Sequence, residues 1–462
     1  MLSVMRCKQI LEDGHSRLRM GLAVGVVIAS ALVPWTGAAA FKFRVIHSFC
    51  GNQNCSFDIS SDLSMDALGN LYGTTTQGGT HERGTAFKLS KRLDGPGWAY
   101  SLLYSFCRRV ACTDGAYPSG YLVVDTSGNL YGVAPSVGFG HGIAFRLAAN
   151  PGHPKWRLEV LHTFCSRAQC IDGDRPLAGL TYAGATSGAP YDGVSPLYGV
   201  TYLGGTQDDG VVFELSPSGG ASRWSERVLY DFCSVKASTC LDGMLPGPDD
   251  RLVMDPAGNL YGMTENGGSG GGSAGGGTIF ELQPNGAGWS ETVLYNFCSV
   301  RDCRDGAWPY GGLLMDSAGT IYGATTWGGG HEGAGVVFKL VPNGSQSQYT
   351  VLYTFCRDGG DCGDGRGPWG GLVMDGNGNL FGTTAAGGGF DWDLNGSGGG
   401  TLFKISGSSL QKIHSFCSQG RTACLDGEYP HGTLLRGSDG TLFGTGELGG
   451  QYQGGVVFEL KP

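Results

Sequence analysis

Short apolar runs separated by turns recur along the chain from about residue 43 to its last residue. In one stretch, residues 312–316 (GLLMD) form an apolar run, residues 317–320 a turn, and residues 321–325 (IYGAT) a second run. A glycine-rich loop then leads to a third run at 335–340 (GVVFKL), and a fourth opens at 349–355 (YTVLYTF). Runs of this length that are rich in β-branched and aromatic residues are typical of strands. The pattern predicts a unit of four β-strands.

The unit recurs seven times, and a pair of cysteines marks each copy. Self-similarity at a fixed period is the signature of a repeat architecture, in which each unit buries its apolar face against its neighbours. The pairs are Cys50 and Cys55, Cys107 and Cys112, Cys165 and Cys170, Cys233 and Cys240, Cys298 and Cys303, Cys356 and Cys362, and Cys417 and Cys424.

Seven units of four antiparallel strands predict an all-β fold, a seven-bladed β-propeller, which closes radially and so removes long exposed sheet edges. The order of the strands supports closure. The region begins with a fourth-strand segment at 43–49 and ends on a third strand at 455–460. Together these two segments would complete one blade from both ends of the domain, residues 41–462.

The first forty residues read as a secretory signal peptide. Arg6, Lys8, Arg17 and Arg19 precede an apolar run at 20–34, which is too short to span a bilayer with ease, and small residues follow at 37–40. Residues 1–40 are therefore expected to be removed on export. Because we find no second hydrophobic segment, we expect a secreted protein without a membrane span.

Export makes disulfides the default state of the fourteen cysteines that follow the signal peptide. A zinc site would need four converging ligands, whereas each cysteine pair is separated from the next by a whole repeat. We therefore predict seven local disulfides that pin loops.

Composition narrows the class of partner. Glycine supplies 85 of 462 residues, yet aromatic residues reach 11%, which is enough to build a core. The net charge of −9 makes nucleic acid and anionic membranes poor partners. We expect a monomer.

The segments GNLYGTT (69–75) and GVVFKL (335–340), with VLYSF-like strands between them, resemble the bacterial GloVer-repeat, choice-of-anchor proteins. The resemblance covers essentially the whole domain. It implies an exported or surface-attached bacterial protein and carries no established activity, so it supplies no catalytic residue. The chain departs from the family's pattern by its cysteine pairs and by the lack of an anchor after the last repeat.

A functional site in a repeat protein should appear as a deviation from the repeat. The disulfide loops, the Asp-Gly pairs and the glycine-rich loops should share one face, where aromatic residues concentrate in repeats five to seven. Two interpretations stay open: aromatic packing over the loops, or a stacking platform for sugar rings with aspartates accepting hydroxyl hydrogen bonds. The candidate ligand-binding residues are Asp305, Trp308, Trp327, Asp364, Trp369, Asp426 and Tyr429.

An insertion in the sixth repeat matches the opening of a calcium loop. Asp391, Asp393 and Asn395 offer oxygens at positions 1, 3 and 5, and Gly396 stands at position 6. Position 12 is Leu402, so the closing carboxylate is missing. Calcium stays open as a possible ligand.

The sequence favours a secreted, non-catalytic binding or scaffold protein for a glycan or another surface component. The alternative is an extracellular polysaccharide lyase or glycoside hydrolase with acidic residues at the mouth of the propeller channel. An isolated pair of acids about 5–10 Å apart at that mouth would favour the enzyme.

Overall fold

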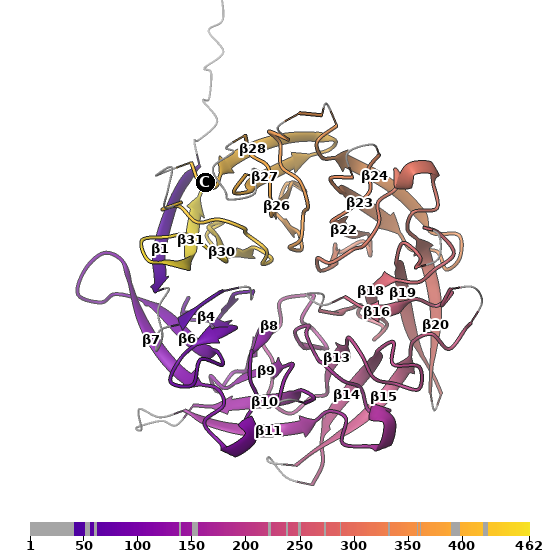
Figure 1. Cartoon of the computed structure of the whole chain (residues 1–462), viewed down its shortest axis with the longest axis horizontal. Coiled ribbons are helices and arrows are strands. Elements are labelled where there is room, and N and C mark those ends of the chain that lie inside the picture. Colours follow the sequence, from indigo (N-terminus) through magenta and orange to yellow (C-terminus); the bar gives the residue numbers. More distant parts are fainter. Residues whose placement is uncertain are drawn as a thin grey trace, which may run out of the picture. The chain divides into compact units, whose positions relative to one another are not determined.

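The structure is a computed structural model, and the residues after Ala40 that it describes form a ring of seven antiparallel sheets, six with four strands and one, in blade 4, with five (Figure 1). The predicted all-β, seven-bladed propeller is confirmed. Among the described residues, no helix is long and apolar enough to cross a membrane. The described residues are 41–50, 56–59, 62–137, 140–149, 156–219, 223–236, 239–247, 251–271, 274–286, 288–330, 333–357, 359–360, 362–389, 398–418 and 424–462.

Each blade runs antiparallel from an inner to an outer strand (Figure 1). Blade 1 comprises β3 (Ser64–Met65), β4 (Leu71–Thr75), β6 (Thr85–Lys91) and β7 (Trp98–Ser105). Blade 2 comprises β8 (Ser119–Val124), β9 (Leu130–Ala134), β10 (Ile143–Ala148) and β11 (Arg157–Thr163). Blade 3 comprises β12 (Thr181–Tyr182), β13 (Leu197–Thr201), β14 (Val211–Pro217) and β15 (Trp224–Asp231). Blade 4 comprises β16 (Met244–Pro246), β17 (Val253–Met254), β18 (Leu260–Asn266), β19 (Thr278–Asn285) and β20 (Gly288–Asn296). Blade 5 comprises β21 (Leu314–Met315), β22 (Ile321–Thr325), β23 (Val336–Val341) and β24 (Gln348–Thr354). Blade 6 comprises β25 (Val373–Met374), β26 (Leu380–Thr384), β27 (Thr401–Ser406) and β28 (Ser409–Ser415).

Blade 7 is built from both ends of the domain. It comprises β29 (Leu435–Arg436), β30 (Leu442–Gly446), β31 (Gln453–Lys461) and β1 (Lys42–Cys50). The first strand pairs antiparallel with the last, with Phe43 opposite Leu460. The predicted closure of the ring is therefore present. The small elements outside the blades are β2 (Ser56–Phe57), which pairs with β5 (Gln77–Gly78), and the 3₁₀ turns η1 (Val110–Cys112), η2 (Ala168–Cys170) and η3 (Arg301–Cys303).

The core lies between neighbouring blades and repeats one packing unit. In blade 5, the fully buried Phe338 of β23 meets Phe297 edge to face, with ring centroids 5.4 Å apart. The glycine of the second strand makes room for it, because a Cβ at Gly323 would lie 2.6 Å from Phe338 Cζ. Truncating such a phenylalanine to alanine typically costs about 3–5 kcal/mol. The Tyr-Gly and Val-Phe pairs that recur in the sequence thus reflect the packing of the core between blades.

Candidate functional site at the channel mouth

Each disulfide loop is tied down by the aspartate of its Asp-Gly pair. The buried carboxylate of Asp305 accepts a hydrogen bond from the Tyr295 hydroxyl at 2.8 Å. It also accepts bonds from the backbone N–H (2.9 Å) and hydroxyl (2.8 Å) of Ser299. A buried charge is tolerated when it is hydrogen-bonded in this way. The carboxylate of Asp305 therefore holds the loop.

Five further aspartates repeat the arrangement with a tyrosine or histidine of the outer strand. Asp305, Asp364 and Asp426, three of the predicted ligand-binding residues, all belong to this set. Their oxygens accept hydrogen bonds from their own loops, which gives these aspartates a structural role in the blades. The further pairs are Tyr104 with Asp114 (2.6 Å), His162 with Asp172 (3.3 Å), Tyr230 with Asp242 (2.8 Å), Tyr353 with Asp364 (2.8 Å) and His414 with Asp426 (3.0 Å).

Six of the predicted disulfides are present in the described residues. Cys50 is also disulfide-bonded, while its predicted partner Cys55 lies outside those residues. The observed bridges join Cys107 to Cys112, Cys165 to Cys170, Cys233 to Cys240, Cys298 to Cys303, Cys356 to Cys362 and Cys417 to Cys424.

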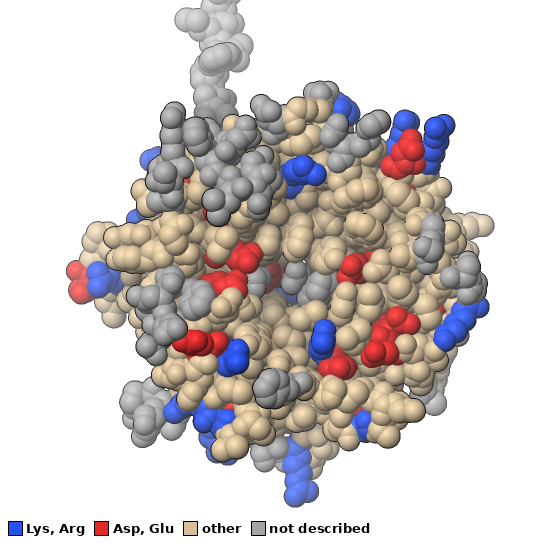
Figure 2. All heavy atoms as spheres, viewed as in Figure 1, with Lys and Arg blue, Asp and Glu red and all other residues tan. Residues whose placement is uncertain are grey.

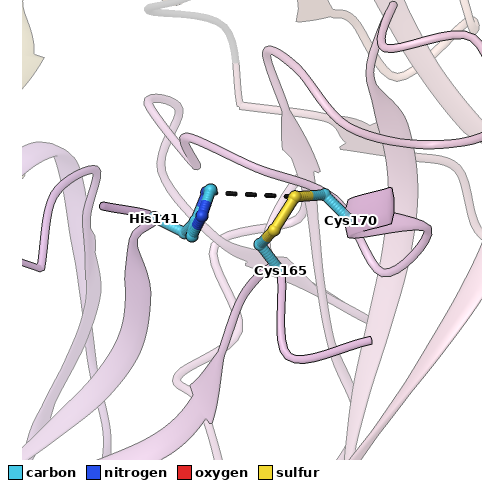
Figure 3. Close-up of side chains that lie close together, drawn as sticks. All are labelled: His141, Cys165 and Cys170. Atoms are coloured by element: carbon cyan, nitrogen blue, oxygen red, sulfur yellow. Dashed lines mark hydrogen bonds between the residues drawn. A yellow bond between two sulfur atoms is a disulfide. The ribbon is translucent and has the colours of Figure 1, made fainter. Parts of the chain in front are cut away.

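One bridge has a histidine beside it. His141 Nδ1 lies 3.9 Å from Cys170 Sγ, in the loop closed by the Cys165–Cys170 bridge (Figure 3). The same nitrogen lies 2.9 Å from Asp174 Oδ2. Metal-binding cysteines are thiolates. Because both sulfurs are joined to each other, this group is a packing contact and not a metal centre.

Three residues after each of the six aspartates, the backbone is left-handed. At Trp308 φ is 52°; its N–H donates to Gly276 of the preceding blade at 3.0 Å, and its carbonyl accepts from the Thr326 N–H at 3.2 Å. Hydrogen bonds on both sides fix this backbone. Asp58 takes the same place in blade 1, with φ 62°. We call the set the mouth positions: Asp58, Tyr117, Arg175, Leu245, Trp308, Gly367 and Tyr429.

An aromatic stack crosses three blades at the same end of the channel. Tyr310, Trp369 and His431 each follow the proline of their loop and precede an inner strand. The rings of Tyr310 and Trp369 are stacked at 5.2 Å, and those of Trp369 and His431 at 4.5 Å. All three side chains are half-buried. The stack thus presents aromatic surface at the mouth of the channel.

Acidic residues continue the stack at both ends. The Tyr310 hydroxyl donates to Glu265 Oε1 at 2.7 Å, and Tyr202 donates to Glu265 Oε2 at 2.9 Å. At the other end, His431 Nδ1 lies 2.8 Å from Glu447 Oε2. Acidic side chains are seen around the central opening of the ring in Figure 2. We call Tyr202, Glu265, Tyr310, Trp369, His431, Glu447 and Asp58 the mouth belt.

Two carboxyls meet at the blade 7 end of the mouth belt. Asp58 and Glu447 are joined by a side-chain hydrogen bond. Burial raises the pKa of Asp58, and the Glu447 charge adds to the rise, although bonds from Thr76 and Gln77 oppose it. Burial alone would also raise the pKa of Glu447, but His431 and Asp58 hold it below its usual value. The two carboxyls are therefore coupled, and their surroundings favour the charged form of Glu447 over that of Asp58.

Blade 6 has small residues beside the indole of Trp369. Its mouth position is Gly367, and Ala385 takes the place that Glu447 has in blade 7. A Cβ at Gly367 would lie 3.5 Å from Trp369 Nε1. The two smallest residues of the repeat thus stand beside the central ring of the stack.

Trp308 and Trp327 form a second aromatic pair in blade 5. Their ring centroids are 5.2 Å apart, and the side chains are 39% and 48% exposed. The remaining predicted aromatic residue, Tyr429, is half-buried and lies 6.3 Å from His431. The structure therefore brings the predicted aromatic residues to neighbouring blades on one face, and their contact with a ligand stays a prediction.

The inner strands of blades 5, 6 and 7 line a cavity of about 200 Å³ that also contains Asp62 and Arg251. Asp62 accepts a bond from the Thr433 N–H at 2.6 Å, and burial raises its pKa while Arg251 lowers it. Small-molecule sites usually have about 300–1,000 Å³. A ligand of that size would stay at the mouth.

Sequence reasoning missed Tyr310, His431, Glu265 and Glu447. It placed Trp369 in the same class as Trp308, because both follow an Asp-Gly pair. Aligning the loops on their proline instead would have placed Trp369 with Tyr310 and His431. The predicted calcium ligands Asp391, Asp393 and Asn395 lie outside the described residues.

The family follows from a sequence comparison. The model of the Gloeobacter/Verrucomicrobia repeat matches residues 187–391 and 248–462. The chain belongs to this family. This membership confirms the resemblance drawn from the repeated segments. No curated protein matches this repeat protein.

Solved structures resemble the repeat protein only distantly. Trypanosoma rangeli sialidase in complex with sialic acid is 11% identical, with a TM-score of 0.37, over 92% of this chain and 59% of that one. PorZ, a surface component of the type-IX secretion system of Porphyromonas gingivalis, is 13% identical, with a TM-score of 0.43, over 90% and 48%. The chain spans about half to three-fifths of their length, and at these scores no activity carries over.

Proposed function

We propose that this repeat protein is a secreted, non-catalytic binding protein that holds sugar rings of a surface glycan at the mouth belt. The observation that carries the proposal is the stack of Tyr310, Trp369 and His431, which ends at Glu265 and Glu447. Because Tyr310 and His431 cover the two faces of the Trp369 indole, we expect a sugar to pack on the exposed ring edges of the stack, where convergent polar groups fix its orientation. The six disulfides support an oxidising location.

The charge of the mouth belt narrows the class of sugar. Its carboxylates accept hydrogen bonds and repel anions, because like charges in a partly buried site interact strongly. We therefore expect neutral or amine-bearing sugars to bind better than uronic or sialic acids.

A hydrolase or lyase is the second candidate, and the Asp58–Glu447 pair is the observation that raises it. Retaining glycosidases place their two carboxyls about 5–5.5 Å apart, and inverting ones about 6.5–9.5 Å. Asp58 and Glu447 instead interact with each other through a side-chain hydrogen bond. This geometry favours binding over hydrolysis.

The test is a screen of the residue 41–462 protein on an array of neutral, amine-bearing and acidic glycans, with reducing-sugar release and unsaturated-product formation assayed on every hit. We expect binding to neutral or amine-bearing glycans without turnover. Release of product that is lost in Glu447→Gln would replace the proposal by the enzyme. No binding to any class would refute a glycan-binding role.

A further inference from the structure

Blade 3 departs from the repeat on the face opposite the mouth belt. In blade 5 the connection between β21 and β22 spans residues 316–320, whereas in blade 3 the connection between β12 and β13 spans residues 183–196. Turns joining the first two strands emerge at the end away from the disulfide loops. The insertion is therefore a deviation of its own, remote from the mouth.

The insertion is tied to two neighbouring blades. The Thr186 hydroxyl donates to the Met254 carbonyl of blade 4 at 2.7 Å. The Tyr191 carbonyl accepts from the Thr126 N–H of blade 2 at 3.0 Å. Tyr191 is fully buried and meets Tyr131 edge to face at 5.2 Å. These contacts give the insertion a fixed position.

A pocket of about 840 Å³ lies between the insertion and the turns of blades 4 and 5. Its apolar lining includes Met254, Met315, Tyr261, Val341 and Pro342. The volume is in the range of small-molecule sites, which combine apolar walls with a few polar groups. Methionine side chains also adapt to the shape of a bound aromatic or aliphatic group.

A carboxylate oxygen in the pocket lacks the partner that its equivalents have. In blade 4, Asn259 Nδ2 donates to Asp255 Oδ2 at 2.9 Å. In blade 5 the asparagine is replaced by Thr320, and among the described residues Asp316 Oδ2 accepts only from the Tyr322 hydroxyl at 3.2 Å. A carboxylate oxygen has two lone-pair sites. Asp316 thus retains acceptor capacity at the pocket wall.

The charged side chains that line the pocket are both negative, whereas the residues behind the lining include both signs, since Lys339 stands opposite Tyr322 on the neighbouring strand. Asp255 and Asp316 both line it, and the described lining includes no lysine, arginine or histidine. Behind Tyr261, the buried Glu281 accepts that residue's hydroxyl hydrogen bond at 2.7 Å. Carboxylates of one sign in a partly enclosed site favour a cation.

We propose that this pocket binds a small organic amine with an apolar body. The ammonium group donates to Asp316 Oδ2, and the apolar body packs on Met254 and Met315. The site is independent of the glycan-binding proposal, because it lies on the other face and shares no residue with the mouth belt.

Titration calorimetry with tryptamine and 3-indolepropionic acid tests the charge, since the two probes carry the same ring with opposite charges. We expect tryptamine to bind at neutral pH at least tenfold more tightly. Asp316→Asn should weaken tryptamine binding about tenfold, the loss of a charge-assisted hydrogen bond. Asp375→Asn in blade 6 removes an equivalent turn carboxylate far from the pocket and should leave binding unchanged.

Ala318→Trp tests the location, because residue 318 lines the pocket and is exposed. It should abolish tryptamine binding, whereas Leu68→Trp, at the same turn place in blade 1, should not. Equal affinity for the two probes, no tryptamine binding at millimolar concentration, or unchanged binding in both pocket variants would overturn the proposal. Asp316→Asn keeps the test valid if the tryptophan variant fails to fold.

Discussion

The imidazole of His431 lies face to face with the indole of Trp369, with ring centroids 4.5 Å apart and the ring planes 18° from parallel. The contact joins blades 7 and 6, so the rings are held by the loops that lead into two separate inner strands. His431 is fixed in turn by its bond to Glu447. A platform held from several blades loses little entropy when a ligand binds, which favours tight binding.

Replacing Trp369 by alanine should weaken binding of the best glycan from the screen by about 1–3 kcal/mol, as for an interface anchor. Because the indole is only half-buried, the melting temperature should change little. Calorimetric titration and thermal unfolding measure the two effects. The control is Trp98→Ala, whose ring packs on Phe443 and should lower stability without changing affinity. A Trp369 variant that loses stability but binds normally would make the stack a packing element.

Replacing Asp305 by alanine should destabilise the protein by about 1–3 kcal/mol, because it leaves the partly buried hydrogen bonds of Tyr295 and Ser299 without their acceptor. Glycan affinity should stay the same. Denaturant unfolding and titration distinguish the outcomes. Unchanged stability with a loss of affinity would instead support the ligand-binding role that the sequence assigned to this aspartate.

The blades and their order were readable from the sequence because packing enforces them. Phe338 requires a glycine opposite it at Gly323, and every blade repeats that requirement in the chain. The mouth belt was less readable. Glu265 lies in the second strand of its blade and Glu447 directly after one, whereas Trp369 and His431 come from loops, and the packing of consecutive blades brings them together.

The loop contacts of the aspartates were not readable from the sequence, for a physical reason. An acid beside aromatic residues on a loop-rich face has the composition of a sugar site, but the sequence does not show where its oxygens point. The Asp305 carboxylate points toward its own blade and accepts a hydrogen bond from the hydroxyl of Tyr295 in the outer strand. The paired spacing of the outer-strand tyrosine or histidine with each Asp-Gly is the signal that would have identified these loop contacts.

Removing β1 (Lys42–Cys50) should expose the edge of β31 and cause aggregation or a large loss of stability, since an unpaired edge templates association. Size-exclusion chromatography and thermal unfolding of a chain that starts at residue 51 measure this. A matched substitution, Lys42→Ala at the exposed start of β1, should behave like the parent. A truncated chain that melts like the parent would contradict the role of closure.

Glu291 should make stability depend on pH. Its Oε1 is buried without a hydrogen-bond partner in the described structure, and burial together with the nearby Asp242 charge raises its pKa to about 8. Between pH 4.5 and 8 the unfolded chain releases this proton while the folded chain retains it, so the free energy of unfolding falls as pH rises and then levels off.

Glu291→Gln removes the carboxylate whose charge destabilises the fold at high pH, and it should stabilise the protein at pH 8.5 by about 1–3 kcal/mol. The expected stabilisation is smaller than the full pKa shift would give, because solvent screens a site that is only partly buried. Unfolding measured from pH 4.5 to 8.5 should show a flatter profile for the variant. The exposed Glu82→Gln should keep the parent profile. A Glu291 variant with the parent's pH dependence would show that this carboxyl is solvated.

Mass spectrometry of unreduced peptides from the secreted protein should find each cysteine linked to its near neighbour, including Cys50 to Cys55. Thiol titration after denaturation should give no free thiol, because seven pairs account for every cysteine after residue 40. Replacing both Cys298 and Cys303 by serine should lower stability by about 2 kcal/mol. Free thiols or links between blades would contradict the local pairing.

At the mouth positions the backbone conformation does not depend on the identity of the side chain. An aspartate, an arginine, a leucine, a tryptophan and a glycine all occur there in the same left-handed conformation, at Asp58, Arg175, Leu245, Trp308 and Gly367. For residues other than glycine that conformation costs about 1–2 kcal/mol, which the flanking hydrogen bonds offset. In this respect the protein resembles an antibody combining site: the backbone conformation is the same at all seven mouth positions, while the side chain at each position can vary. Duplication and drift of single blades could diversify recognition while the core sequence stays constant.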